Sequence, residues 1–388
     1  MFENILGKKL MAQGSVVSID PLSQNILFAA VNREQNALTA KSASYRPRAY
    51  DREFYDVLAK HIRQQRENYP NMDLQKASLV LPDQLFLLDM ISIPMIHRKA
   101  MQHSLSLAVE SIYKNADDLD LVTYTVQQTK QAATFGLAGV RRDLLEDVKL
   151  VFADNGITVT GVTFASNAMV NGAFALNSKL RGETFLLLDI KEHYSRFAFV
   201  VRGCTMGYFD LPFGHGILYE SRLAAENKLF DHRAGELLVL NAKERARAKQ
   251  LTMEDVVPNV LSEDGLAEES VPEDIYRRGG RRLPKYMLRP LPETAEGYVY
   301  ENFRIFIKWA LELINNNPSI VALAKLDKVY VNLPQQYNFL FDVINHDRAE
   351  QGVTFAPLVA EPTEITFTEN LELYGGLFLD QFNEANTF

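Results

Sequence analysis

Cysteine is nearly absent from this sequence, whose 388 residues include only Cys204. No disulfide can form within the chain, and a reducing compartment fits this composition best. Long apolar runs are absent as well, since none approaches the roughly 20 residues that a membrane-spanning helix needs. Residues 1–11 lack the apolar core and the cleavage site of a signal peptide. We expect them to form a frayed terminus, with an amphipathic segment on an anionic membrane surface as the alternative.

Positive charge is in the minority. The 41 lysines and arginines are outnumbered by 49 aspartates and glutamates, which gives a formal net charge of −8. This balance argues against a nucleic-acid backbone as the main partner. Apolar residues make up 47% of the chain, enough for substantial cores, and 388 residues exceed the usual size of a single core. We therefore expect two lobes or domains.

The common catalytic signatures are missing too. The seven histidines show no H-x-x-x-H spacing and the chain has no cysteine pair, so a metal site of the zinc type is not expected. There is no G-x-S-x-G elbow, no Walker lysine loop and no dinucleotide fingerprint. Nothing near Cys204 in the sequence would activate a thiolate, so we interpret Cys204 as a small buried hydrophobe.

One pattern is present twice. Ser15–Asp20 and Phe185–Asp189 each have the composition of a buried strand that ends in aspartate. A short turn leads each time into a second strand, Ile26–Val31 in the first case and Arg196–Val201 in the second. Each pair predicts a β-hairpin with a carboxylate at its tip. Two such hairpins predict two halves that are built alike.

The elements that follow the hairpins are also repeated. After the first hairpin come a helix-like segment at Arg52–Asn68 and a short buried strand at Ala77–Leu81. After the second come a helix-like segment at Tyr298–Asn316 and a strand at Lys328–Leu333. The order of hairpin, helix and strand therefore occurs twice, and it predicts an α/β protein with two similar lobes.

Each lobe carries an inserted region. Residues 84–164 combine strand-like and helix-like segments and predict a small αβ subdomain. Residues 223–297 begin with a helix-like segment of mixed charge at Leu223–Leu251. The following stretch, Glu254–Glu296, is at first acidic and then basic, with the basic charge gathered at Arg277–Arg289. We expect a solvated loop region there, and the alternative is an electrostatic dock for an acidic partner. The expected boundaries are 1–182 for the first lobe and 183–388 for the second.

Two glycine-containing pairs indicate how a helix ends or packs. Asn155-Gly156 follows the helix-like segment Asp143–Asp154, and we expect it to end that helix. Gly375-Gly376 lies in the segment Leu371–Phe382, which predicts a closing helix. We expect these two glycines to allow close helix packing rather than to contact a ligand.

An Asp-tipped hairpin in each of two αβ lobes is the ground plan of the actin-like ATPase superfamily, a duplicated ribonuclease H-like fold. A closer resemblance is to PilM, the family of actin-like type IV pilus assembly proteins. It covers most of the chain outside Leu223–Glu296 and depends on the order and spacing of several segments. These are Met90–Met95 before a helix that carries Val109-Glu110, Gly139–Leu145 running on to Asn155-Gly156-Ile157, Val162–Ala168, and Leu188-Asp189 running on to Gly203 and then Leu211–Gly214.

This resemblance implies an α/β, two-lobed actin-like fold with an αβ insertion in each lobe. It implies a cytoplasmic scaffold, peripheral at the inner face of the cell membrane, in the assembly platform of a type IV pilus or a related secretion or competence system. The implied partner is the cytoplasmic peptide tail of a membrane-anchored, PilN-like protein, held in a groove between the core of the first lobe and its insertion. We expect Leu85–Ile93 and Val162–Ala168 to lie near that groove. The oligomeric state is left open.

Nucleotide sites of this superfamily need glycine in three turns, where a Cβ would block the approach of the nucleotide. The first turn, Asp20-Pro21-Leu22-Ser23-Gln24, has Leu22 in the glycine position, and the second, Asp189-Ile190-Lys191, has Lys191. The third, Leu333-Pro334-Gln335-Gln336, has no glycine, and its proline also removes a donor. The resemblance therefore implies a pseudo-ATPase without a cofactor. Its vestigial nucleotide site would retain Asp20, Ser23, Gln24, Asp189 and Lys191.

Lys191 would fill such a site. Its ammonium group can occupy the space of a phosphate and pair with Asp20 or Asp189, whereas the simpler interpretation of the two aspartates is a turn or capping role. The rival function is an active ATPase of the same fold, which would use Asp20, Ser23 and Asp189 with Mg-ATP. A small-molecule kinase of the same superfamily is less favoured, because it would need an intact adenosine turn and a polar substrate cleft.

Overall fold

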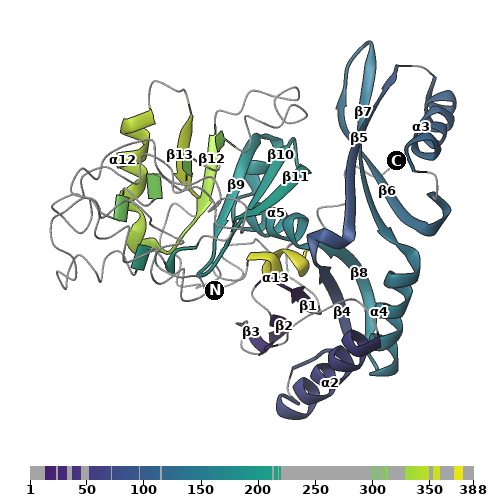
Figure 1. Cartoon of the computed structure of the whole chain (residues 1–388), viewed down its shortest axis with the longest axis vertical. Coiled ribbons are helices and arrows are strands. Elements are labelled where there is room, and N and C mark those ends of the chain that lie inside the picture. Colours follow the sequence, from purple (N-terminus) through teal and green to yellow (C-terminus); the bar gives the residue numbers. More distant parts are fainter. Residues whose placement is uncertain are drawn as a thin grey trace, which may run out of the picture. The chain divides into compact units, whose positions relative to one another are not determined.

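The computed structural model describes several stretches of the chain (Figure 1). They are 14–22, 25–32, 37–44, 52–70, 72–95, 97–113, 116–211, 214–216, 218–219, 299–300, 303–304, 307–308, 311–312, 328–348, 353–358 and 371–378. The chain divides into two compact units, one formed by Met1–Phe213 with Asn317–Phe388 and the other by Gly214–Asn316. The predicted helix Tyr298–Asn316 falls in the second unit, where its described residues are helical. The basic stretch Arg277–Arg289 lies outside the described residues.

The first hairpin opens a five-stranded sheet with the strand order β3-β2-β1-β4-β8. The two ladders of β1–β2 and β2–β3 are antiparallel, while β4 runs parallel to β1 and β8 runs parallel to β4. Every residue of β1 is buried, as expected for a strand covered on both faces. The bounds are Ser15–Asp20 for β1, Asn25–Asn32 for β2, Ala37–Ser44 for β3, Lys76–Leu81 for β4 and Thr158–Phe164 for β8.

The second hairpin opens a sheet of the same design, with the order β11-β10-β9-β12-β13. The directions match as well, since β9, β10 and β11 are antiparallel neighbours and β12 and β13 run parallel to β9. The internal duplication predicted from the two hairpins is therefore confirmed. The bounds are Thr184–Ile190 for β9, Ser195–Val201 for β10, Cys204–Leu211 for β11, Lys328–Asn332 for β12 and Thr354–Pro357 for β13.

The duplication extends past the parallel strands into a short motif. Leu81-Pro82-Asp83-Gln84 leaves β4 and Leu333-Pro334-Gln335-Gln336 leaves β12. In each, the proline precedes a single 3-10 turn, η1 (Asp83–Leu85) or η5 (Gln335–Tyr337), with nearly equal backbone angles (φ −56°, ψ 140° and φ −53°, ψ 134°). The sequence of Tyr337–Asn345 predicts a helix, and because η5 precedes it, the helix begins at Phe339 as α12 (Phe339–Arg348). Asp83 in the first lobe and Gln335 in the second are therefore equivalent positions.

The insertion forms a third sheet, with the order β5-β7-β6, covered on one face by α3 (Arg98–Ile112). Apolar side chains from α3, β5 and β7 form its core, among them Met101, Val109, Ile91, Ile93, Phe135 and Leu137. The bounds are Phe86–Pro94 for β5, Leu119–Gln128 for β6 and Ala132–Arg141 for β7. The predicted subdomain of strands and helices is therefore present in this part of the chain.

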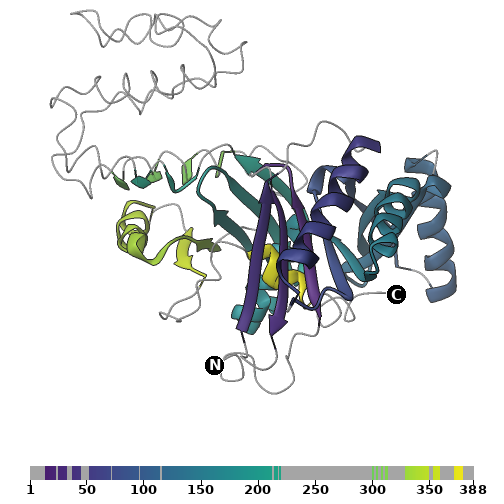
Figure 2. The ribbon, with the colours of Figure 1, turned by 90° about the horizontal axis from the view of Figure 1, so that it is seen from below.

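Two helices, α2 (Arg52–Asn68) and α4 (Arg142–Asp154), cover one face of the first sheet (Figures 1 and 2). Their apolar stripes pack on the strand residues: Phe54, Leu58, Ile62, Leu145, Val148 and Phe152 join Val17, Ile19, Phe28 and Leu79 in one core. As predicted, α4 ends at Asn155-Gly156, where Gly156 takes a φ of +71° that favours glycine.

The other face of the first sheet is covered by α13 (Leu371–Gly376), and α5 (Ala165–Leu176) packs between α13 and the second sheet. The predicted closing helix is shorter than expected, because the described helix ends at the glycine pair and Leu377 and Phe378 form a turn. The packing role predicted for this pair is confirmed. A Cβ on Gly375 would lie 1.6 Å from the carbonyl oxygen of Ala168, and one on Gly376 would lie 2.5 Å from Val16 Cγ2.

No helix of the described residues is long and apolar enough to cross a membrane. The predicted lobe boundaries at 182 and 183, and the second insertion at 223–297, stay predictions.

Candidate functional site

The tips of the two hairpins touch. Asp20, the last residue of β1, is 2% exposed, and its Oδ1 accepts a hydrogen bond from the backbone N–H of Leu22 (3.1 Å). Its Oδ2 accepts a second one from the hydroxyl of Tyr194 (2.5 Å), which lies in the turn between β9 and β10. The first bond is the turn interaction common for aspartate at a strand end. The second joins one sheet to the other.

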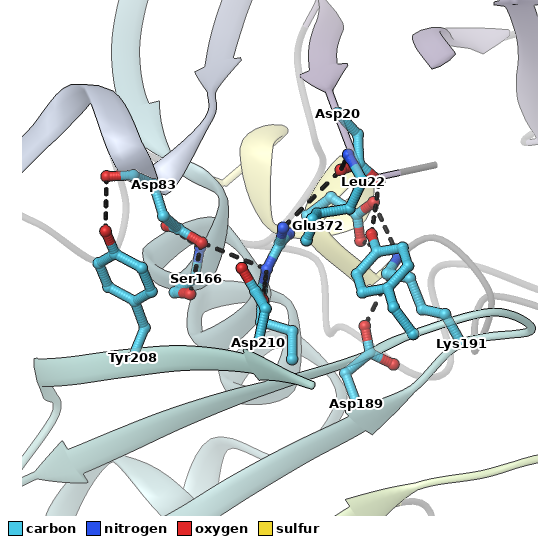
Figure 3. A network of polar contacts seen from close by, with 11 residues as sticks. Asp20, Leu22, Asp83, Ser166, Asp189, Lys191, Tyr208, Asp210 and Glu372 are labelled. Atoms are coloured by element: carbon cyan, nitrogen blue, oxygen red, sulfur yellow. Dashed lines mark hydrogen bonds and ion pairs between the residues drawn. The ribbon is translucent and has the colours of Figure 1, made fainter. Parts of the chain in front are cut away.

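Lys191, in the same turn, is nearly buried between two carboxylates (Figure 3). Its Nζ donates to both oxygens of Glu372 (2.8 and 2.7 Å) and lies 3.6 Å from Asp189 Oδ2. The other oxygen of Asp189 accepts a hydrogen bond from Asn332 Nδ2 (2.7 Å), at the end of the adjacent β12. Of the two predicted partners of Lys191, Asp20 and Asp189, the structure places Asp189 within ion-pair distance. The nearer partner of Lys191, Glu372, lies 181 residues further along the chain and was not predicted.

Arg196, in β10, is 2% exposed and inserts among three carboxylates. Its Nε lies 3.2 Å from Asp83 Oδ2 and 3.1 Å from Asp210 Oδ1, and its Nη2 lies 3.8 Å from Asp20 Oδ1. Its Nη1 has no hydrogen-bond partner among the described residues. Asp20 is the last residue of β1 and Asp83 follows β4, both in the first sheet, whereas Asp210 belongs to β11 of the second. A single guanidinium group therefore joins both sheets.

Asp83 is fully buried and is bonded on several sides (Figure 3). Its Oδ1 accepts a hydrogen bond from the backbone N–H of Ser166 and its Oδ2 one from the hydroxyl of the same residue, both at 2.8 Å. Its backbone oxygen accepts one from the hydroxyl of Tyr208 (2.9 Å), in β11. The residue therefore fixes the start of α5 and the middle of β11 to the end of β4.

We call these residues the central charge cluster: Asp20, Asp83, Asp189, Lys191, Tyr194, Arg196, Asp210 and Glu372. Burial raises the pKa of Asp83 to about 6, even though Arg196 and the bonds from Ser166 act in the opposite direction. Burial also raises the pKa of Asp189, with a further rise from the charge of Glu372. Burial likewise raises the pKa of Asp210.

The two cations keep their charge. Burial alone would lower the pKa of Lys191, but the adjacent Glu372 and Asp189 carboxylates outweigh it and raise the pKa. Burial acts in the same way on Arg196, and Asp83 leads the neighbours that hold its pKa well above the usual value. Both side chains therefore act as permanent positive charges at the junction of the two sheets.

This arrangement predicts that acidification stabilises the cluster. A carboxyl whose pKa is raised on folding binds its proton more tightly in the native state, so its contribution is complete below about pH 4 and disappears as the pH rises through about 6. We expect the free energy of unfolding in urea to be larger at about pH 5 than at about pH 7.5. The increase should be smaller in Asp83→Asn, which cannot take up that proton. Equal pH dependence in the two proteins would contradict the assignment.

A separate feature is a groove of about 370 Å³ between the first sheet and the insertion. One side is β8, the outermost strand of its sheet, and the other is the face of the insertion sheet that does not contact α3. The lining comprises Phe86, Asp120, Val122, Tyr124, Ala138, Val140, Leu145, Lys149, Val159–Phe164, Asn167 and Gly203–Thr205. Both predicted segments, Leu85–Ile93 and Val162–Ala168, contribute to it.

One end of this groove is bridged by contacts from β6 to β11. The hydroxyl of Tyr124 donates to the backbone oxygen of Thr205 (2.8 Å), and the thiol of Cys204 lies 3.7 Å from the backbone oxygen of Thr125. Gly136 admits the tyrosine ring, because a Cβ there would lie 2.3 Å from Tyr124 Cε2. Cys204 is buried as predicted, and burial raises its pKa to about 11, which keeps the thiol protonated.

No family model and no curated protein matches the sequence. Among solved structures, the chain is similar to a "PilM-PilN type IV pilus biogenesis complex" at 14% identity and a TM-score of 0.53, over 94% of this chain and 98% of that one. The cytoplasmic domain of EpsL, an inner membrane component of the type II secretion system of Vibrio cholerae, matches at 14% identity and a TM-score of 0.35, over 54% and 74%. MreB 5 of Spiroplasma citri bound to AMPPNP matches at 11% identity and 0.38, over 96% and 98%.

Only the first of these TM-scores exceeds 0.5. The fold likeness that it indicates is consistent with the duplicated strand order of the two sheets. The chain has an actin-like fold. It is an α/β fold of two lobes, as the hairpins predicted. An identity of 14% carries the likeness no further than the fold, so the closer resemblance to PilM stays a prediction.

The actin-like fold implies a magnesium–nucleotide complex between the two hairpin tips, and the residues here do not fit one. Both oxygens of Asp20 are engaged by groups of the protein, and the ammonium of Lys191 beside Asp189 would repel a metal ion. Leu22 and Lys191 stand where the resemblance to the superfamily implies glycine. Among the described residues, no group of three or more histidine, cysteine, aspartate or glutamate side chains is arranged to hold a metal.

The structure brings three of the five predicted site residues, Asp20, Asp189 and Lys191, into one network. Ser23 and Gln24 lie outside the described residues. Sequence reasoning missed Arg196 and Asp83. A signal for Arg196 was available, because it is the one charged residue in the apolar strand Ser195–Val201. A charge in a fully buried strand requires a partner.

Proposed function

We propose that this protein is a scaffold of a type IV pilus assembly platform, or of a related secretion or competence system, and that it binds an extended peptide of a membrane partner without turning over ATP. The groove between β8 and the insertion sheet is the observation that carries this proposal. The actin-like fold, seen also in a structure titled as a PilM–PilN complex, supports it.

The groove suits an extended peptide. Because β8 is the outermost strand of its sheet, its outer edge can pair with an added strand, and main-chain hydrogen bonds would then supply much of the affinity. The walls offer apolar surface from Phe86, Val122 and Val140 for side chains of the peptide. A volume of about 370 Å³ is of the size that takes a small number of such side chains.

The central charge cluster supports the second part of the proposal. Where an ATPase of this fold would need an open cleft for phosphates, Lys191 and Arg196 supply built-in positive charge to the carboxylates. The two lobes are then joined without a ligand. We propose that the protein is a pseudo-ATPase whose closed arrangement is permanent, and that it lies in the cytoplasm, peripheral to the membrane through its partner.

A variant in the groove tests peptide binding. Val122 is 50% exposed in β6 and faces the groove, so arginine can replace it without entering the core. We expect Val122→Arg to lower the affinity for the bound tail at least about tenfold, because a bulky charge would occupy the peptide's position. Fluorescence anisotropy with synthetic cytoplasmic tails of PilN-like membrane proteins measures this.

The matched control is Val343→Arg. Val343 is also exposed (38%), but it lies in α12, away from the groove lining, so this variant should bind like the wild type. Thermal melting of both variants checks that folding is unchanged. If the wild type binds none of the tails, or if both variants bind equally well, the groove is not the peptide site.

A further inference from the structure

Arg196 does not line the groove, yet the residues that it contacts are attached to each of the groove's walls. The insertion wall begins at Phe86, three residues after Asp83. The β8–α5 wall includes Asn167, which follows Ser166, the residue that donates two hydrogen bonds to the Asp83 carboxylate. The groove has three walls, formed by the insertion sheet, by β8 with the start of α5, and by the start of β11. The first begins close to Asp83 in the chain, and the second is hydrogen-bonded to Asp83 through Ser166.

The third wall, at the start of β11, is joined to the same point. The hydroxyl of Tyr208 donates to the backbone oxygen of Asp83, and Arg196 bonds Asp210 in β11 as well as Asp83. The bridge at the end of the groove continues this contact, because Thr205 accepts from Tyr124 and its own hydroxyl donates to Asn167 Oδ1 (3.0 Å). All three walls are thus connected, through the chain or through hydrogen bonds, to the ion pair between Arg196 and Asp83.

We propose that Arg196 is a positioning residue of the groove: by binding Asp83 and Asp210 together it sets the spacing of the three walls, and so controls the affinity for a peptide that it does not touch. This inference rests on the proposed function of the groove. In a nucleotide-dependent actin-like protein a bound nucleotide would lie between the two lobes, whereas here the side chain of Arg196 joins them.

The physical reason is the shape of the guanidinium group. The planar group fixes the direction of the Nε–H bond, and Nε lies between carboxylates of different elements, 3.2 Å from Asp83 Oδ2 and 3.1 Å from Asp210 Oδ1. A lysine keeps the charge but has a methylene carbon at the position of Nε, so it lacks the N–H that lies between Asp83 and Asp210. Coupling between two sites is reciprocal. A peptide that binds the groove only when its walls have this spacing would therefore stabilise the ion pair between Arg196 and Asp83 in turn.

Hydrogen exchange of the full chain tests this without any peptide. In Arg196→Lys we expect the amides of β6 and β8 to exchange at least about fivefold faster than in the wild type, while those of α2 and the β12–β13 pair are unchanged. Asp83→Asn, which removes the other half of the pair, should give the same pattern. The matched control is Arg63→Lys, because the Arg63 side chain bonds the backbone of its own helix.

Anisotropy with the PilN-like tails adds the functional readout, and both variants should bind at least about fivefold more weakly than Arg63→Lys. If the wild type binds no tail, the proposed function fails, but the exchange data still decide the role of Arg196. Wild-type exchange in β6 and β8 in both variants would overturn the inference. So would a uniform rise in every element, or loss of the fold in both, because Arg196 would then support global stability alone.

Discussion

Gly375→Ala is expected to lower the free energy of unfolding by more than about 4 kcal/mol, or to prevent folding. The added Cβ would lie 1.6 Å from the carbonyl oxygen of Ala168 and 2.5 Å from the backbone nitrogen of Gly172. Both are backbone atoms of α5, so no side-chain rotation can relieve the overlap. The two helices would have to separate, and the cores that they share with both sheets would open. Urea denaturation followed by circular dichroism measures the loss.

Gly182→Ala is the matched control for this variant. A Cβ on Gly182 would meet no atom within 4 Å, so the free energy of unfolding should stay within about 0.5 kcal/mol of the wild type. A result in which the two variants are equally stable would mean that α5 and α13 do not pack at this distance.

Lys191→Met is expected to lower the free energy of unfolding by about 3–5 kcal/mol. It removes the ammonium group from between Glu372 and Asp189, both of which are 1% exposed, and leaves two buried carboxylates without the cation that they share. Part of the loss should be recovered by adding Glu372→Leu, because the double variant no longer buries the unpaired charge of Glu372. Urea denaturation at neutral pH compares the three proteins.

The control for burial is Lys328→Met. Lys328 Nζ lies 2.8 Å from Glu183 Oε2, nearly the distance of the Lys191–Glu372 pair, but these side chains are 47% and 30% exposed. An exposed pair contributes about 0–1 kcal/mol, so this variant should change stability little. If Lys191→Met and Lys328→Met destabilise the protein equally, Lys191 is not the buried cation of the cluster.

The hairpins and their aspartates could be predicted from the sequence because the signal is local. In Phe185–Asp189 an apolar run ends in a carboxylate within a few residues, and the turn that follows fixes the partner strand. The alternation of side chains at Thr134–Ala138 predicts a strand there, but a shorter one than the observed β7, Ala132–Arg141. Gly139 suggests a turn, yet it lies inside the strand. It makes room for Leu121, whose Cδ2 would lie 2.4 Å from a Cβ at that position.

The partners of the site could not be predicted in the same way. Glu372 reaches Lys191 only because α13 returns to the first sheet, and Asp83 has the local sequence of a residue that simply ends a strand after Pro82. Such contacts depend on which elements the folded chain brings together. The sequence shows that Arg196 and Asp83 are charged residues at or next to buried strands. That they pair with each other can be known only from the topology of both sheets.

The central claim is that side chains of the protein occupy the position of a magnesium–nucleotide complex. Isothermal titration calorimetry of the full chain with Mg-ATP tests it most directly. The cluster of Lys191, Arg196 and their carboxylates predicts no saturable heat of binding, because the cations that would meet the phosphates are already bonded within the protein. A micromolar dissociation constant would contradict this account and would favour an active ATPase that uses Asp20 and Asp189.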